Sequence, residues 1–215
     1  MLQQISKREL AQAQIVLVIA IFLQFMVYQA NHSFSQTQFF IILAEAAMVL
    51  VVSFSASIKT LHSRSLHRFA AIMLLLLLST ANISSLVVVL QSLITGSSEL
   101  SGLQLLASAV AIFVTNIIVF ALWYWEIDSP GLTRKRWSSR DKDFQFTQQD
   151  MKQEFPTWKP EFLDYLYLSV TNAINFAAAD AKPLSHGAKL LMSLQAMVSV
   201  FTLALVIARS VSILG

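Results

Sequence analysis

Long apolar runs alternate with short polar segments along the chain. Five of these runs have the roughly 20 residues that a helix needs to cross a hydrocarbon core of about 30 Å. They lie at residues 11–29, 39–58, 69–94, 103–125 and 188–214. Because the apolar positions fill whole blocks instead of one helical stripe, we predict that each run is a membrane-spanning helix.

A further apolar stretch, residues 162–180, is shorter and carries Asn172, Asn175 and Asp180. An ionised carboxylate at the bilayer centre costs at least about 2.5–3.5 kcal/mol. This segment therefore either dips into the bilayer and returns, walled off from lipid by protein, or crosses as a sixth span with hydrogen-bonded amides. The re-entrant form is our first choice, because it keeps the basic residues on both flanks on one side. These are Lys159, Lys182, His186 and Lys189.

The predicted fold class is an all-α integral membrane protein, a bundle of five transmembrane helices plus a short re-entrant or sixth spanning segment. We expect a single membrane domain over residues 1–215, with one long loop at 127–160. Trp123, Tyr124 and Trp125 are predicted to form an interfacial aromatic belt. Aromatic residues of the long loop, Phe144 and Phe146 among them, are expected to lie against the headgroups.

Basic residues alternate between the connections. The N-terminal segment has two, the connection at 31–38 has none, the loop at 59–68 has three, the connection at 95–102 has none, and the long loop has seven. By the positive-inside rule, the segments rich in Lys and Arg stay in the cytoplasm. The chain is thus predicted to be a multi-pass membrane protein with a cytoplasmic N-terminus.

Composition argues against several other classes of protein. Charged residues make up 13% of the chain, whereas soluble domains carry about 25%. No basic groove with interleaved aromatic residues points to nucleic acid. Cysteine is absent, the five glycines are not clustered, and His62 and His67 are poorly spaced for one helical face. We therefore expect no enzyme activity, no catalytic residues, no cofactor and no metal site.

Three polar residues stand out inside the long spans. Glu45 lies in the second span, Asn82 in the third and Arg209 in the last. An intramembrane ionisable group marks a candidate site, and the amide lies in the most polar stretch of any span. If the segment at 162–180 is re-entrant, Arg209 comes level with Glu45, and we hypothesise an ion pair between them. The alternatives are a protonated or amide-paired structural Glu45, an Arg209 that snorkels to the interface, and an Asn82 that joins helices.

The stretch from Phe162 to Leu184, followed by a long apolar helix, resembles the pore helix, filter and inner helix of potassium channels. On that pattern Tyr167 and Ser169 fall in the pore helix, and residues 175–180 fall on the filter. Alanines at 177–179 replace the glycines that let filter carbonyls face an ion, so the resemblance does not imply potassium selectivity. The charge-based topology also makes the segment enter from the cytoplasm, opposite to potassium channels.

Residues 105–215 resemble more closely a family of uncharacterised bacterial multi-pass membrane proteins, a domain of unknown function. The shared elements are the aromatic end of the fourth span, an Asp-Phe-x-Phe element at Asp143–Phe146, and a Phe-Leu-Asp-Tyr-Leu-Tyr segment from Phe162. The resemblance implies a bacterial inner-membrane setting and no established activity.

Two hypotheses for the function follow. In the first, the protein is an ion or small-solute channel or transport protein, whose segment at 161–183 lines a path. Its partners are then the lipid bilayer, further copies of the chain and an inorganic ion. In the second, it is a non-conducting structural or sensory membrane protein in which the same segment only packs helices together. The candidate pathway residues are Asn172, Asn175, Asp180, Glu45, Asn82 and Arg209.

Overall fold

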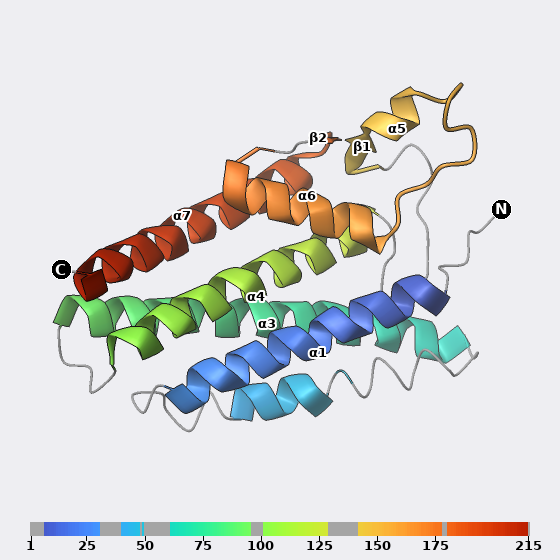
Figure 1. Cartoon of the computed structure of the whole chain (residues 1–215). Coiled ribbons are helices and arrows are strands. Elements are labelled where there is room, and N and C mark those ends of the chain that lie inside the picture. Colours follow the sequence, from blue (N-terminus) through green and yellow to red (C-terminus); the bar gives the residue numbers. More distant parts are fainter. Residues whose placement is uncertain are drawn as a thin grey trace.

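The computed structural model describes residues 7–30, 40–47, 49, 61–95, 101–128, 142–177 and 180–214, with backbone alone at 7, 30, 61–68, 93–95 and 209–214 (Figure 1). The described chain is mostly helical. Its elements, in chain order, are α1 (Lys7–Ala30), α3 (Leu61–Thr95), α4 (Gly102–Asp128), β1 (Phe144–Phe146), α5 (Thr147–Asp150), α6 (Phe162–Asn175), β2 (Ala181–Pro183) and α7 (His186–Leu214). Residues 40–47 are also helical, and we call them segment 40–47.

Four of the described helices are long and apolar enough to cross a membrane. They cover Arg8–Gln29, Phe69–Ser92, Gly102–Asp128 and His186–Ala208, which agrees with the first, third, fourth and last predicted spans. The predicted second span, 39–58, is helical where it is described, and its remaining residues lie outside the described part. The fold is thus that of a helical membrane protein. The count of five or six spans stays a prediction.

Apolar side chains face outward and polar side chains face inward, which is the reverse of a water-soluble bundle. Large apolar residues face outward on every long helix, such as Phe22 on α1, which is 58% exposed, and Met197 on α7. The amides Gln24, Asn116 and Gln195 are buried instead. An exterior of this kind is stable only against lipid, whereas the polar groups find partners in the protein interior. This sorting supports a bilayer as the solvent of the bundle.

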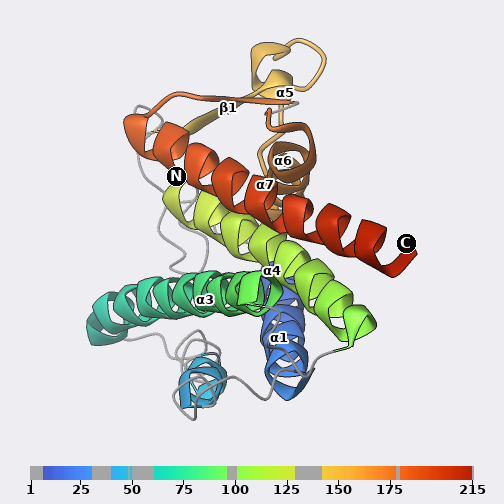
Figure 2. The ribbon, with the colours of Figure 1, turned by 90° about the vertical axis from the view of Figure 1, so that its left-hand side faces the viewer.

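Helix α4 lies at the centre of the bundle. It packs against α1 and α3 on one side and against α6 and α7 on the other, with segment 40–47 outermost beyond α1 and α3 (Figure 2). The buried core joins Leu17 of α1, Leu74 of α3 and Leu122 of α4. Because α4 touches both halves, its polar side chains can connect the two sides of the molecule.

Two boundaries differ from those predicted, and one sheet was not predicted. The loop expected at 59–68 is helical from Leu61, because α3 continues beyond its apolar span. The long loop begins only after Asp128, and its described part holds a strand and a short helix. A two-stranded antiparallel sheet pairs Phe144 with Pro183 and Phe146 with Ala181, which hydropathy alone did not predict because strands of three residues carry almost no periodic signal.

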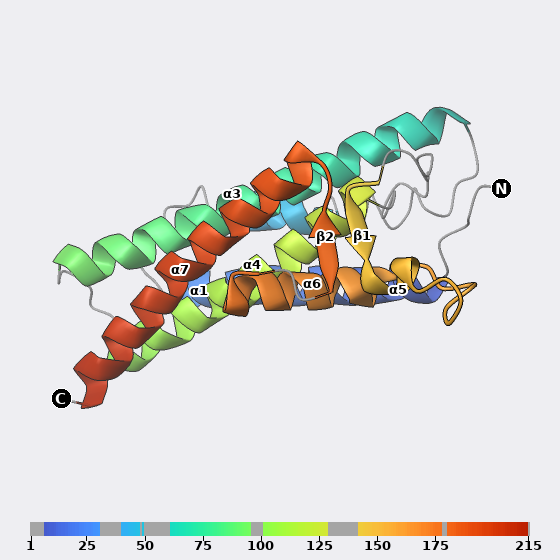
Figure 3. The same ribbon diagram turned by 90° about the horizontal axis from the view of Figure 1, so that it is seen from above.

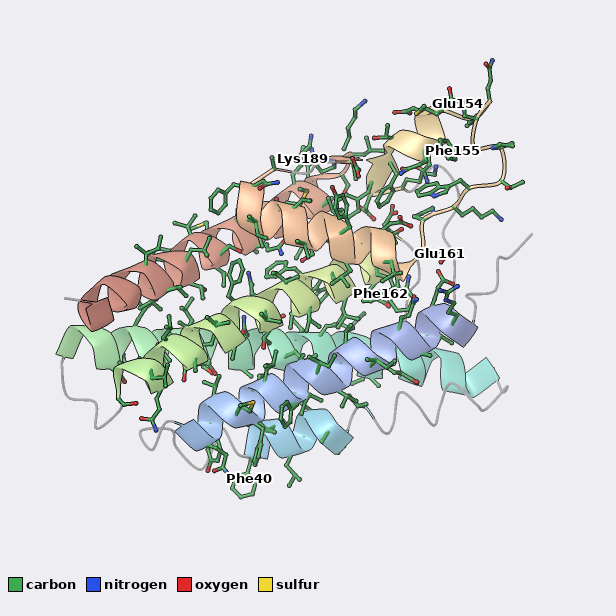
Figure 4. The ribbon with its side chains drawn as sticks, viewed as in Figure 1. Phe40, Glu154, Phe155, Glu161, Phe162 and Lys189 are labelled. Atoms are coloured by element: carbon green, nitrogen blue, oxygen red, sulfur yellow. The ribbon has the colours of Figure 1, made fainter. Side chains whose placement is uncertain are left out.

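The chain around α6 leaves one end of the bundle and comes back to it. Phe162, the first residue of α6, points into the bundle (Figure 4) and its ring lies 5.3 Å from that of Trp125, near the end of α4. After α6 the chain returns to β2, which lies beside β1 between α6 and the start of α7 (Figure 3). The starts of α6 and α7 thus lie toward the end of the bundle where α4 finishes.

The start of α1 lies at this same end. Asp164 in the first turn of α6 accepts a hydrogen bond from the backbone amide of Glu161 at 2.7 Å. Burial raises the pKa of Asp164 above its ordinary value; the amide hydrogen bond lowers it, and the negative charges of Glu161 and of Glu9 on α1 raise it. The electrostatic contact with Glu9 shows that α1 and α6 begin close together.

Helix α6 ends at a residue in a left-handed backbone conformation. Phe176 has φ 54° and ψ 26°, a region that costs an L-residue other than glycine roughly 1–2 kcal/mol. The turn breaks the helical path at this point and lets the chain double back toward β2. Glycine would adopt the same conformation without that cost.

We expect Phe176→Gly to raise the melting temperature of the purified protein in detergent by about 2–4 °C, since about 1 kcal/mol of strain is released. Ile174→Gly, two residues earlier and inside the helix, is the matched control and should lower it. Circular dichroism melts would measure both. Equal losses in the two variants would show that the left-handed turn carries no strain.

Candidate functional site

Asn172 lies on the buried face of α6, where this helix packs between α4 and α7. Its side chain is 2% exposed. The amide nitrogen donates to the hydroxyl of Tyr124 at 3.2 Å, to the backbone oxygen of Met192 at 3.0 Å and to Oε1 of Gln195 at 2.8 Å. Both of its hydrogens therefore have partners, and the group is not left for a ligand.

Gln195 of α7 completes this polar network. Its Oε1 accepts a hydrogen bond from the hydroxyl of Tyr124 at 2.5 Å, and its Nε2 donates to the backbone oxygen and the hydroxyl of Ser169 at 3.0 and 2.6 Å. The hydroxyl of Ser169 in turn donates to the backbone oxygen of Ile117 on α4 at 2.7 Å. These side chains are buried, so the network joins three helices in the apolar interior.

Asn175 and Asp180, the other two candidates of this segment, lie on the surface. Asn175, Phe176 and Ala177 are all exposed, as is Asp180. The backbone oxygen of Asp180 accepts hydrogen bonds from the amide and the hydroxyl of Thr147 at 3.0 and 3.1 Å. The segment between α6 and β2 is thus held at one end by α5, while its side chains stay accessible.

Asp128 closes α4 and holds the β1–β2 sheet. Its Oδ1 accepts hydrogen bonds from the backbone amides of Asp143 and Phe144 at 2.7 and 3.0 Å, and its Oδ2 accepts one from the hydroxyl of Tyr165 at 2.6 Å. Three donors satisfy the partly buried carboxylate. One side chain thereby joins α4, β1 and α6.

The start of α7 is hydrogen-bonded to Asp143, the residue before β1. The hydroxyl of Ser185 donates to the carboxylate of Asp143 and accepts a hydrogen bond from the backbone amide of Ala188 at 3.0 Å. This is the bonding expected of a residue that caps the N-terminus of a helix. The backbone amide of Leu184 donates to the backbone oxygen of Asp143 at 2.8 Å. The position of α7 is therefore coupled to that of β1.

The aromatic residues at this end pack inward. Tyr124, Trp125 and Phe144 are fully buried and Phe146 nearly so. The Phe144 ring lies 5.3 Å from that of Tyr124, and the Phe146 ring 5.3 Å from that of Tyr165. Our expectation that these residues contact headgroups was wrong, because each ring fills the space between α4, α6 and the sheet.

A second polar region lies on the other side of α4. A small pocket there has room for about one water-sized ligand, and residues of α1, segment 40–47 and α3 line it. They are Gln24, Tyr28, Ile41, Ile42, Ala81, Ser84 and Ser85. The buried face of segment 40–47 also carries Glu45, whose side chain is fully buried.

Several oxygen atoms of this region have no hydrogen-bond donor among the described residues. They are Oε1 of Gln24, both carboxylate oxygens of Glu45 and Oδ1 of Asn82. Gln24 does use its nitrogen, which donates to the backbone oxygen of Leu78 at 3.2 Å. Buried polar atoms are nearly always paired, so a cluster of unpaired acceptors calls for a group that supplies positive charge or hydrogens.

The ion pair hypothesised between Glu45 and Arg209 is not favoured. Segment 40–47 and α7 lie on opposite sides of α4 (Figure 2). The side chain of Arg209 lies outside the described residues.

Sequence reasoning missed the roles of Tyr124, Asp128 and Tyr165. A signal was present for one of them: Tyr165, Ser169 and Asn172 follow one another at the spacing of a single helical face. Asp128 gave no such signal, because its partners lie 15 to 37 residues further along the chain.

In the part of the chain that the structure describes, no group of three or more His, Asp or Glu side chains could hold a metal ion. No protein-family model, curated protein or solved structure matches the chain. Fold and sites together define the class as a multi-pass helical membrane protein with two buried polar regions.

We expect Asn172→Ala to destabilise the protein by about 1–2 kcal/mol, because it leaves buried partners on α4 and α7 without a donor. Asn175→Ala, one turn further along the same helix and exposed, is the matched control and should change stability by less than about 0.5 kcal/mol. Thermal unfolding in detergent would measure both. Equal effects would contradict the structural role of the network.

Proposed function

We propose that the protein belongs to the channel or transport class, and that α6 is a re-entrant helix whose far end meets a water-filled path for a small inorganic cation. The alternative, a non-conducting protein, shares the same fold. The two differ in what surrounds the turn between α6 and β2.

The length and surface of α6 support the re-entrant interpretation. Its 14 residues span about 21 Å, less than the roughly 30 Å of a hydrocarbon core. Its outward face carries Leu163, Tyr167 and Ile174, which are about half exposed. An apolar outer face and a polar inner face suit a helix that enters lipid while it leans on other helices.

The depth of the turn follows from its contacts. Asn172 is hydrogen-bonded to Met192 and Gln195, which lie six and nine residues into the candidate span His186–Ala208. The last turn of α6 therefore lies about 9–14 Å inside this end of the span. Phe176 and Ala177, which follow, are exposed and non-helical.

The observation that carries the proposal is this exposed, non-helical backbone. Lipid offers no hydrogen bonds, so irregular backbone at membrane depth is found only where protein covers it or where it lines a water-filled cavity. In a single copy of the chain, nothing described covers residues 175–177. A homo-oligomer in which several such turns surround a wet path satisfies this requirement.

Charge favours a cation in such a path. The C-terminal end of a helix carries a partial negative charge, and Asp180 adds an exposed carboxylate nearby. Lys and Arg are absent from residues 161–181. A path lined in this way would attract cations and repel anions.

The distribution of basic residues supports an orientation. Lys7 and Arg8 begin α1, and Lys182 and Lys189 flank the start of α7 at the same end of the bundle. The connections at the opposite end, 31–38 and 95–102, contain no Lys or Arg. The positive-inside rule then favours a cytoplasmic N-terminus, with five spans and α6 entering from the cytoplasm. The resemblance of residues 105–215 to bacterial membrane proteins favours a bacterial inner membrane.

The second candidate, a non-conducting structural or sensory protein, also has a specific observation in its favour. The polar face of α6 is saturated by the network around Asn172, as expected of a packing device. If several copies bury the turn completely against one another, no water enters.

Accessibility of single cysteines tests the water-filled path, since the chain has no native cysteine. We expect Asn175→Cys, Ala177→Cys and Asp180→Cys to react with a charged, membrane-impermeant thiol reagent added on the cytoplasmic side. Asn172→Cys is the buried control and should react about tenfold more slowly or not at all. Protection of all four would contradict the path, and reaction of Asp180→Cys from outside only would establish six spans.

Flux through reconstituted vesicles tests conduction itself. We expect Asn175→Lys to reduce cation flux about tenfold or more, because a fixed positive charge in a poorly screened site repels the permeating ion. Glu154→Lys, an exposed position on the turn after α5 (Figure 4), makes a larger change in net charge away from the path and should conduct normally. Absence of flux in the unmodified protein would favour the non-conducting alternative.

A further inference from the structure

The acceptor-rich region between α1, segment 40–47 and α3 is independent of α6, which lies on the other side of α4 (Figure 2). Phe40, at the start of segment 40–47, points away from the bundle (Figure 4) and is 62% exposed. Ile41, Ile42, Glu45 and Val49 form the opposite, inward face of the segment. The carboxylate is therefore turned toward the other helices and away from the outer surface.

Helical spacing brings Glu45 next to the pocket that Gln24 lines. Ile41 and Ile42 line the pocket together with Gln24, and Glu45 follows them on the same face by one turn. On the far side of Glu45, Val49 packs against the main core. Glu45 thus lies between the pocket and the core, where α1 and α3 meet the segment.

Asn82 belongs to the same level of α3. Gln24 is bonded to the backbone oxygen of Leu78, and Asn82 lies one turn beyond Leu78 on the same face of this helix. It also directly follows Ala81 and precedes Ser85 by three residues, and both of those residues line the pocket. Three helical elements therefore each carry one buried, oxygen-bearing side chain that lines this pocket or lies next to its lining residues in the helix.

The number of unpaired oxygens decides between two ligand chemistries. A single proton on Glu45 provides one hydrogen-bond donor, whereas four oxygen atoms of three side chains lack one among the described residues. A small metal cation can contact several oxygens at once and also neutralises the carboxylate. Hard cations prefer carboxylate and amide oxygens of this kind. One carboxylate and two neutral amides balance a single positive charge, not two.

We propose that Glu45, Gln24 and Asn82 form an intramembrane binding site for a small monovalent metal cation such as Na⁺. The cation joins α1, segment 40–47 and α3, and stabilises their packing. The site does not depend on a path through α6, so either proposal can fail without the other.

Thermal unfolding of the full-length protein in detergent tests the site, with NaCl compared with choline chloride at equal ionic strength. We expect saturating Na⁺ to raise the melting temperature by about 3–6 °C, since a ligand that binds only the folded state stabilises it. The rise should saturate with concentration. Because no flux is measured, the result is independent of conduction.

Variants make the test specific. Glu45→Gln removes the charge at nearly constant shape, so it should abolish the response to Na⁺ and melt higher than the unmodified protein in choline chloride, where the carboxylate is buried without a counter-charge. Asn82→Leu should raise about tenfold the Na⁺ concentration at which half of the rise in melting temperature is reached. Glu154→Gln, which removes an exposed carboxylate, should respond as the unmodified protein does.

Several results would overturn the proposal. These are an equal melting temperature in NaCl and choline chloride, a response that does not saturate, or a response that persists in Glu45→Gln. If the melting temperature depends on pH in every salt but does not depend on Na⁺, a proton alone occupies the site. Binding of ²²Na⁺ by the unmodified protein but not by Glu45→Gln would support the site directly.

Discussion

A bilayer supplies no hydrogen bonds, and the organisation of this protein follows from that constraint. The outward faces of the long helices are apolar, and polar side chains are brought together where helices meet. On the side of α4 that packs against α6 and α7, the side-chain donors around Asn172 and Gln195 all have partners. We place function in two other regions, the exposed turn after α6 and the unpaired oxygens around Glu45.

Helix α4 couples these regions because it contacts both halves of the bundle. At its end, Asp128 binds the backbone of β1 and the hydroxyl of Tyr165. Through β1 and the bond between Ser185 and Asp143, the start of α7 is tied to the same carboxylate. A shift of α4 along its axis would therefore move α6 and α7 together.

The sequence was sufficient for the features that depend on composition over many residues. Four of the five predicted long spans correspond to described helices, because about 20 apolar residues have few other stable conformations in a cell. Asn172 was recognised as an unusual residue but not as part of a saturated network, since Tyr124 and Gln195 lie 48 and 23 residues away. The inward packing of Tyr124 and Trp125 was equally hidden, because an aromatic residue near the end of a span has the same local sequence whether it faces headgroups or a neighbouring helix.

The pairing of β1 with β2 has a consequence for how the chain is made. At roughly 5–20 residues per second, the ribosome completes β1 several seconds before β2. During that interval α6 is made without the strand that follows it in the folded protein. The two-stranded sheet forms only after residues 181–183 have been synthesised, so β1 is without its partner strand while α6 is being made.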